Sequence, residues 1–362
     1  MIAYRAFRAC LLAALCVLNV SAWSQQPPPR IPTSERRALL TLYASTQGAS
    51  WTVRTNWLGA AGSECQWYGV VCNGGGDAVN VVSLPNNNLT GPLPDELNAL
   101  THLGIFDVSN NRLIGPIPAL TGLAELGNFN VAGNQLTGSI PSLYGLAQLR
   151  NFIASDNRLT GAIPNLTGTP LISFFHVANN QLTGTIPALD GLTHLSGFNV
   201  GGNQLTGDVP SVPVPTGLQA GRSTLCPNYL NHTADAAWNA ATGQSPWYAN
   251  CPIAPQAGLW WNPAESGSGY GLDFRHGVLV VTVYSYTESG PPIWYLASGP
   301  VIDNVFTATL DKYQGGQCIS CAYRPTAPNG NDGTISIFFT SPTKATMILP
   351  GGRNFPIVPQ DF

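Results

Sequence analysis

The chain has 362 residues, of which only 9% are charged, and its formal net charge is −3. It contains no run of Lys or Arg, which argues against nucleic acid and anionic membrane surfaces as partners, because both require clustered positive charge. Its 39 Gly and 30 Pro would be typical of a low-complexity chain, but many of them recur at a fixed period and therefore indicate ordered repeats.

Residues 1–22 are expected to form an export signal. Arg5 and Arg8 give a positive start, an apolar stretch follows from Ala9 to Val20, and small residues end it at Ala22. The stretch is too short to span a bilayer, and no other apolar run reaches the roughly 18 residues needed. We expect a mature chain without a transmembrane segment that is secreted, periplasmic or held at the cell surface. Lipid attachment at Cys16 is a less favoured alternative.

Six cysteines remain after removal of the signal, and they fall into three close pairs: Cys65 with Cys72, Cys226 with Cys251, and Cys318 with Cys321. An even number of cysteines in an exported chain predicts disulfides. Fifteen connectivities are open, and pairing of nearest neighbours is the one we favour. A zinc site at the last pair is the alternative, but a second pair of ligands is not found nearby in the sequence. We predict no metal and no cofactor.

Residues 79–212 consist of repeats. The phrase Asn-x-Leu-(Thr/Ile)-Gly recurs six times at spacings of 24, 23, 23, 23 and 23 residues, each copy followed by an apolar residue and Pro. The repeated asparagines are Asn87, Asn111, Asn134, Asn157, Asn180 and Asn203. Their side chains are expected to satisfy backbone groups that the turn after each short strand leaves unpaired, since losing one buried partner costs about 1–3 kcal/mol.

Each repeat also carries a large apolar residue at a fixed place in its strand. In register these residues predict a continuous aromatic spine; they are Val82, Phe106, Phe129, Phe152, Phe175 and Phe198. One repeat cannot bury its apolar face alone, so the units must stack.

This pattern resembles the plant-type leucine-rich repeat of receptor ectodomains and polygalacturonase-inhibiting proteins. The resemblance extends upstream to Trp51, Trp57 and the segment Cys65-Gln66-Trp67-Tyr68-Gly69-Val70-Val71-Cys72, which is similar to the N-terminal cap of that family. It implies an α/β-type leucine-rich-repeat solenoid of six repeats with a parallel sheet on its concave face. We expect an N-terminal cap over residues 23–78 and a C-terminal cap over residues 213–252.

Residues 253–362 differ in composition and predict a small, mainly antiparallel all-β domain. Expected strands include Val278–Tyr286, Ile293–Ala297, Thr334–Phe339 and Ala345–Leu349. The segment Gly258-Leu259-Trp260-Trp261-Asn262-Pro263-Ala264-Glu265-Ser266-Gly267 resembles a β domain of exported bacterial proteins. The acidic residues of the C-terminal β domain are expected at the surface; they are Glu265, Asp273, Glu288, Asp303 and Asp311. Its aromatics Trp260, Trp261, Tyr270, Trp294 and Tyr295 are expected mainly in the core, with stacking on sugar rings as the alternative.

Counting around each repeat asparagine assigns the strand positions that face outward on the concave side. The recognition groups expected there are Asp107, Asn128, Asn130, Asn151, Phe174, His176 and Asn199. An exposed aromatic beside a polar neighbour is typical of interfaces. The sequence thus predicts an exported, non-enzymatic binding protein that engages a protein or a cell-surface glycan outside the cytoplasm.

Three further hypotheses remain open at this point. The resemblance implies that the chain could inhibit a polysaccharide-degrading enzyme. The C-terminal domain could bind or hydrolyse carbohydrate. A column of repeated threonines, Thr90, Thr137, Thr160, Thr183 and Thr206, could bind ice.

Overall fold

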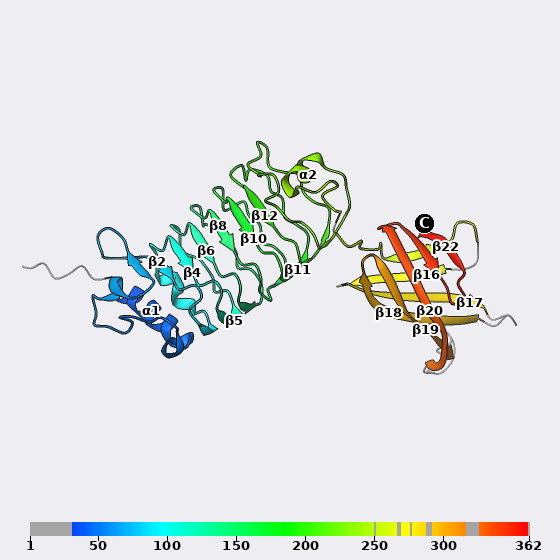
Figure 1. The fold of residues 1–362 in the computed structure, drawn as a ribbon, viewed down its shortest axis with the longest axis horizontal. Coiled ribbons are helices and arrows are strands. Elements are labelled where there is room, and N and C mark those ends of the chain that lie inside the picture. The colour runs from blue at the N-terminus through cyan, green and yellow to red at the C-terminus, as the bar shows by residue number, and fades with distance from the viewer. Residues whose placement is uncertain are drawn as a thin grey trace, which may run out of the picture.

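A computed structural model describes residues 31–249, 251–265, 269–275, 277–286, 292–315 and 326–360. The predicted export signal and the predicted Cys318–Cys321 disulfide lie outside these residues, as does Glu288. A curved stack of repeats is followed by a separate barrel of strands (Figure 1). Within the described ranges, no helix is long and apolar enough to cross a membrane.

The N-terminal cap consists of one helix, two short 3-10 turns and one strand. The elements are α1 (Thr33–Ser45), 3-10 turns at Gly48–Ser50 and Glu64–Gln66, and β1 (Val70–Cys72). Helix α1 buries Ala38, Leu39 and Leu42 against the open end of the repeats. The Cys65–Cys72 disulfide is present as predicted. It ties strand β1 to the 3-10 turn at Glu64–Gln66.

The concave face is one sheet in the order β1-β2-β4-β6-β8-β10-β12. Six parallel strands come from the repeats, namely β2 (Val79–Ser83), β4 (Ile105–Asp107), β6 (Asn128–Asn130), β8 (Asn151–Ile153), β10 (Phe174–His176) and β12 (Gly197–Asn199). The predicted parallel sheet is confirmed. The cap strand β1 joins it antiparallel, so the face has seven strands and spans about 29 Å at 4.8 Å per gap.

The side of the solenoid carries two smaller parallel sheets. One contains β3 (Thr90–Pro92), β5 (Arg112–Pro116) and β7 (Gln135–Thr137); the other contains β9 (Thr160–Gly161), β11 (Gln181–Gly184), β13 (Gln204–Gly207) and β14 (Tyr229–Leu230). The pairing is staggered, so that Thr137 lies opposite Pro116 and Thr183 lies opposite Gln204. This register separates the repeated threonines and gives no flat threonine row of the kind that the ice-binding hypothesis requires.

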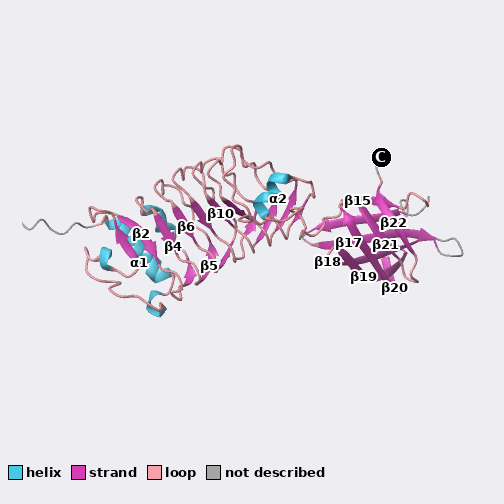
Figure 2. Cartoon of the chain, turned by 45° about the horizontal axis from the view of Figure 1, so that its top comes forward, coloured by secondary structure: helices cyan, strands magenta, loops and turns pink. Residues whose placement is uncertain are grey.

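Helices are few, and Figure 2 shows them near the two ends of the solenoid. The first repeat has a 3-10 helix over Asp95–Ala99, and among the described residues the repeats themselves contain no α-helix. The C-terminal cap contributes α2 (Ala236–Thr242), whose first turn is capped by the Asp235 carboxylate accepting from the amides of Ala237 and Trp238. The predicted Cys226–Cys251 disulfide is present in this cap.

The aromatic spine runs through the whole solenoid core. Phe106, Phe129, Phe152, Phe175 and Phe198 are buried, and each ring stacks on the next with centroids 5.5–5.7 Å apart. The last ring meets Trp238 of helix α2 at 6.2 Å. The spine therefore ends on a cap residue rather than on solvent.

The repeat asparagines form a second internal ladder. The side-chain amide of Asn157 donates to the carbonyl oxygens of Val131, Ala154 and Ser155, and its Oδ1 accepts from the Leu136 amide. Two of these four groups belong to the preceding repeat, so each asparagine joins neighbouring coils. Asn228 continues this ladder from within the C-terminal cap.

Residues 258–359 form a closed antiparallel barrel of eight strands. In order these are β15 (Gly258–Trp261), β16 (Gly269–Arg275), β17 (Val278–Tyr286), β18 (Pro292–Ile302), β19 (Val305–Gly315), β20 (Thr326–Ser341), β21 (Lys344–Ile348) and β22 (Asn354–Pro359). The antiparallel β domain is confirmed. Its closure through β15 and β22 was not predicted.

Side chains fill the barrel interior. Trp260 and Tyr270 are buried there, as the core interpretation predicts, together with Phe306 and Met347. Tyr295 packs against this core and donates to the Asp332 carboxylate at 2.6 Å. Its neighbour Trp294 lies on the opposite, outer side of the strand, because successive residues of a strand alternate between faces.

The asparagine ladder should contribute measurably to the stability of the solenoid. We expect Asn157→Ala to lower the free energy of unfolding by about 2–4 kcal/mol, because it leaves an amide and several carbonyl groups without partners inside the coil. Denaturant unfolding of the full chain measures this loss.

Asn151→Ala is the matched control, since Asn151 lies on the concave face of the same repeat and its side chain makes no hydrogen bond within the described part of the chain. Its effect should stay within about 0.5 kcal/mol. Equal losses of unfolding free energy in Asn157→Ala and Asn151→Ala would contradict the stabilising role of the ladder.

Candidate functional site

The register of the concave sheet arranges its outward side chains in two rows that cross the strands. The first row reads Val71, Val81, Ile105, Asn128, Asn151, Phe174 and Gly197. The second row reads Ser83, Asp107, Asn130, Ile153, His176 and Asn199. All seven predicted recognition residues lie in these rows.

One end of the face is aliphatic. Val71, Val81 and Ile105 are direct cross-strand neighbours on β1, β2 and β4, and the first and last are 54% and 39% exposed. Exposed aliphatic side chains on adjacent strands form a small apolar patch. The patch was missed as a recognition element because one of its three residues, Val71, lies on the cap strand, where only the alternation around Val70 and Cys72 indicates that it faces outward.

Side-chain amides occupy the centre. Asn128 and Asn151 are direct neighbours in the first row, and Asn130 lies beside them in the second. Asn130 accepts a hydrogen bond from the Ala132 amide. The Oδ1 atom of Asn128 is buried and has no hydrogen-bond partner within the described residues. A buried acceptor without a partner costs free energy, so this atom is suited to a donor from a bound molecule.

The other end of the face is aromatic. The rings of Phe174 and His176 meet edge to face with centroids 5.5 Å apart. Both lean towards Gly197 on the next strand, where an added Cβ would lie 3.0 Å from a Phe174 ring carbon and 3.1 Å from His176 Nε2. The glycine thus provides the space that the two rings occupy.

His176 is held in its neutral form. Burial lowers the pKa of its imidazole below the ordinary value, and its Nε2 atom is buried without a partner in the described structure. A neutral imidazole carries one donor and one acceptor nitrogen. His176 can therefore exchange a hydrogen bond with a ligand without introducing charge.

The two remaining predicted residues are already engaged. The Asp107 carboxylate accepts from the backbone amide of Ser109 at 3.0 Å and from its hydroxyl at 2.7 Å. Asn199 Oδ1 accepts from the Thr224 hydroxyl at 3.1 Å. Both side chains help shape the surface, and each has less capacity left for a ligand than Asn128 or Asn151.

The arrangement offers little for chemistry. Asp107 and His176 lie on β4 and β10, three strand gaps apart, about 14 Å at 4.8 Å per gap, which is too far for proton exchange between them. Among the described residues there is no group of three or more His, Cys, Asp or Glu that could hold a metal ion. What the face provides is a polar surface with a single carboxylate and two apolar ends.

The low pKa of His176 has a consequence for stability. Unfolded histidine titrates near pH 6.5, so the stability due to this residue is complete above that pH and is lost as the pH falls through the lower folded pKa. We expect His176→Gln to reduce the drop in unfolding free energy between pH 7.5 and pH 5.5. The exposed His194→Gln variant serves as control, and the pH dependence of its stability should match that of the parent chain. If the unfolding free energy of His176→Gln falls with pH as much as that of the parent chain, the lowered pKa of His176 is contradicted.

No protein-family model matches the chain. The receptor-like kinase TMK2 of Arabidopsis thaliana is 37% identical over 68 residues, which is 19% of this chain and 7% of the kinase. Receptor-like protein 3 of the same plant is 30% identical over 105 residues, 29% of this chain and 14% of that protein. The chain thus spans less than a sixth of either relative.

Similar solved structures include a plant ice-binding protein, with 25% identity over 58% of this chain and 67% of that chain at a TM-score of 0.48. The BIR2 ectodomain of Arabidopsis thaliana has 32% identity over 42% of this chain and 83% of its own, at a TM-score of 0.39. The repeat geometry and the curated sequence matches together identify the chain as a plant-type leucine-rich-repeat protein.

Proposed function

We propose that the chain is an exported recognition protein whose concave face binds an extended segment of a partner protein outside the cytoplasm. The observation that carries this proposal is the distribution of side chains on the face: an aliphatic end, an amide centre and an aromatic end in one row.

The spacing of the two ends favours an extended peptide. Ile105 and Phe174 lie on β4 and β10, which are three strand gaps or about 14 Å apart. An extended chain rises about 3.3 Å per residue, so two apolar side chains about four residues apart would reach both ends. The central amides would then lie opposite the backbone between these two anchors.

The amide centre suits a peptide backbone. Asparagine side chains supply both donors and acceptors, and Asn128 Oδ1 has no partner of its own within the described residues. The face carries a single carboxylate, that of Asp107, whose Oδ1 accepts two hydrogen bonds from Ser109, and burial favours the neutral form of its one imidazole, His176. It therefore favours a segment that is itself uncharged.

A protein segment is preferred to a glycan at this face. A glycan would use mainly the single Phe174 ring for stacking, leaving the aliphatic patch of Val71, Val81 and Ile105 without a function. Two disulfides, at Cys65–Cys72 and Cys226–Cys251, support action in an oxidising compartment outside the cytoplasm. The proposed role is binding without catalysis.

A displayed peptide library selected on the full chain tests this proposal. We expect enrichment of uncharged peptides with two apolar residues about four positions apart. Phe174→Ala and Ile105→Ala should each weaken binding of such a peptide about tenfold or more, the size of a loss expected when a central anchor is removed.

Tyr144→Ala is the control, because Tyr144 is 82% exposed and lies outside the concave strands. It should leave the affinity unchanged. Peptides that bind the parent and the two concave-face variants equally well would contradict the proposed site, and so would selection of peptides without the paired apolar residues.

A further inference from the structure

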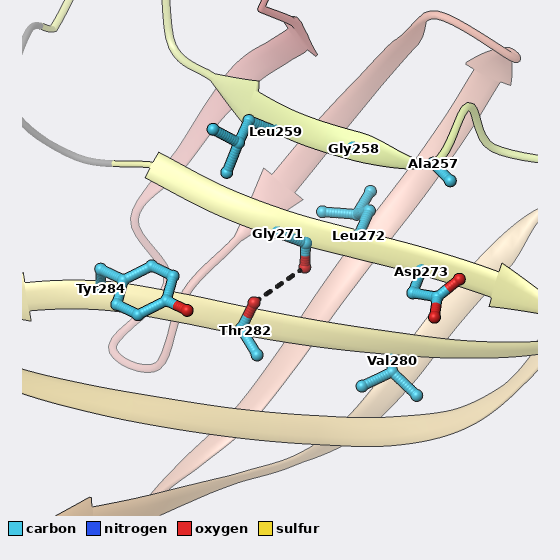
Figure 3. A pocket seen from close by; sticks show the side chains of 9 residues that line it. All are labelled: Ala257, Gly258, Leu259, Gly271, Leu272, Asp273, Val280, Thr282 and Tyr284. Carbon is cyan, nitrogen blue, oxygen red and sulfur yellow. Dashed lines mark hydrogen bonds between the residues drawn. The ribbon is translucent and has the colours of Figure 1, made fainter. Parts of the chain in front are cut away.

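The outer surface of the barrel contains a groove of about 550 Å³ over strands β15, β16 and β17 (Figure 3). Its lining consists of Ala257, Gly258, Leu259, Gly271, Leu272, Asp273, Val280, Thr282 and Tyr284. The groove lies in a different domain from the concave face.

Strand β16 forms the floor because its outward positions carry little bulk. Gly271 lies directly between Leu259 of β15 and Thr282 of β17. A Cβ placed on Gly271 would come within 2.4 Å of the Thr282 hydroxyl oxygen. Because Gly271 has no side chain, the outer surface of the sheet is open at this point. The side chains of Leu259 and Tyr284 lie on either side of the opening.

One residue that lines the groove, Tyr284, belongs to an aromatic row on the outer surface of the barrel. Tyr284 of β17 pairs with Trp294 of β18, which pairs with Tyr313 of β19. Tyr284 and Trp294 point outward, since their strand neighbours Val283 and Tyr295 pack in the barrel core. Tyr313 lies on the same side, because its ring stacks on that of Trp294. Trp294 and Tyr313 stack with centroids 4.7 Å apart, which fixes the indole and covers one of its faces, and Tyr284 is 57% exposed.

Polar groups complete the lining. Thr282 offers a hydroxyl that donates weakly to the Gly271 carbonyl at 3.4 Å. Asp273 offers a carboxylate, with one oxygen 3.1 Å from the Arg275 guanidinium. Among the described residues that line the groove, Asp273 is the one that carries a charge, and this charge disfavours an anionic ligand.

We propose that this groove binds a neutral glycan. A pyranose ring has one face of C–H groups and a rim of hydroxyls, and the groove pairs aromatic and aliphatic walls with a hydroxyl and a carboxylate acceptor. Tyr284 and Leu259 contact the C–H face, Asp273 and Thr282 bind hydroxyls, and Gly271 leaves room for the ring. A mainly apolar lining with a few placed polar groups is the general pattern of small-ligand sites.

Titration of the full chain with cellohexaose and with maltohexaose, followed by calorimetry, tests the proposal, with trigalacturonic acid as the charged comparison. We expect saturable binding of at least one neutral hexasaccharide and at least tenfold weaker binding of the charged sugar. Tyr284→Ala should weaken the neutral interaction about tenfold. Gly271→Val, which fills the floor and displaces the Thr282 hydroxyl, should abolish it.

Phe338→Ala is the matched control, because Phe338 is an exposed aromatic on the outer side of β20, away from the groove. It should bind like the parent chain. Circular dichroism of each variant verifies that the barrel is folded, and the exposed Tyr284 decides the outcome if Gly271→Val does not fold. Absence of neutral-sugar binding at millimolar concentration, equal binding by Tyr284→Ala, or preference for the charged sugar would overturn the proposal.

Discussion

The hydrogen bonds of the repeat asparagines are the interaction on which the rest of the solenoid depends. Each buried amide bonds backbone groups of its own repeat and of the repeat before it, as Asn157 does with Ala154 and Leu136. A buried amide satisfied on both sides tolerates almost no change in the spacing of adjacent coils. The stacked phenylalanines add apolar burial along the same axis. Together they hold adjacent strands in one register, and this register alone decides which side chains share the concave face.

A rigid, repeated backbone allows the outward residues to vary without loss of fold. The concave face shows this clearly: equivalent strand positions carry Ile105, Asn128, Asn151, Phe174 and Gly197. Recognition then depends on the order of these residues along the row. The barrel differs: Gly271 leaves a gap in the layer of outward side chains, and Leu259 and Tyr284 line the opening. The two surfaces are chemically distinct and lie in separate domains.

Much of the solenoid could be predicted because its periodicity is local. The asparagine phrase, the phenylalanine positions and the cap disulfides at Cys65–Cys72 and Cys226–Cys251 all follow from short sequence patterns. The pattern Leu225-x-x-Asn228-x-Leu230 would also have located Asn228, the next member of the ladder. It was not recognised as a repeat because Asn228 lies 25 residues after Asn203 and close to Cys226. Barrel closure between β15 and β22 could not be predicted, since it joins strands about 100 residues apart. The contribution of Val71 to the concave face was hidden for a related reason, because the cap strand joins the sheet antiparallel and lies outside the repeat. The partner itself is not encoded in any motif of the chain.

Hydroxyl-radical footprinting of the full chain with and without a bound partner protein tests the central claim most directly, because it reports which side chains the partner covers. The claim predicts that labelling of Phe174, Ile105 and Val71 decreases together when the partner binds, while Tyr144 stays unchanged. Protection confined to Tyr144 or to the barrel, with the concave residues labelled as in the free chain, would contradict it.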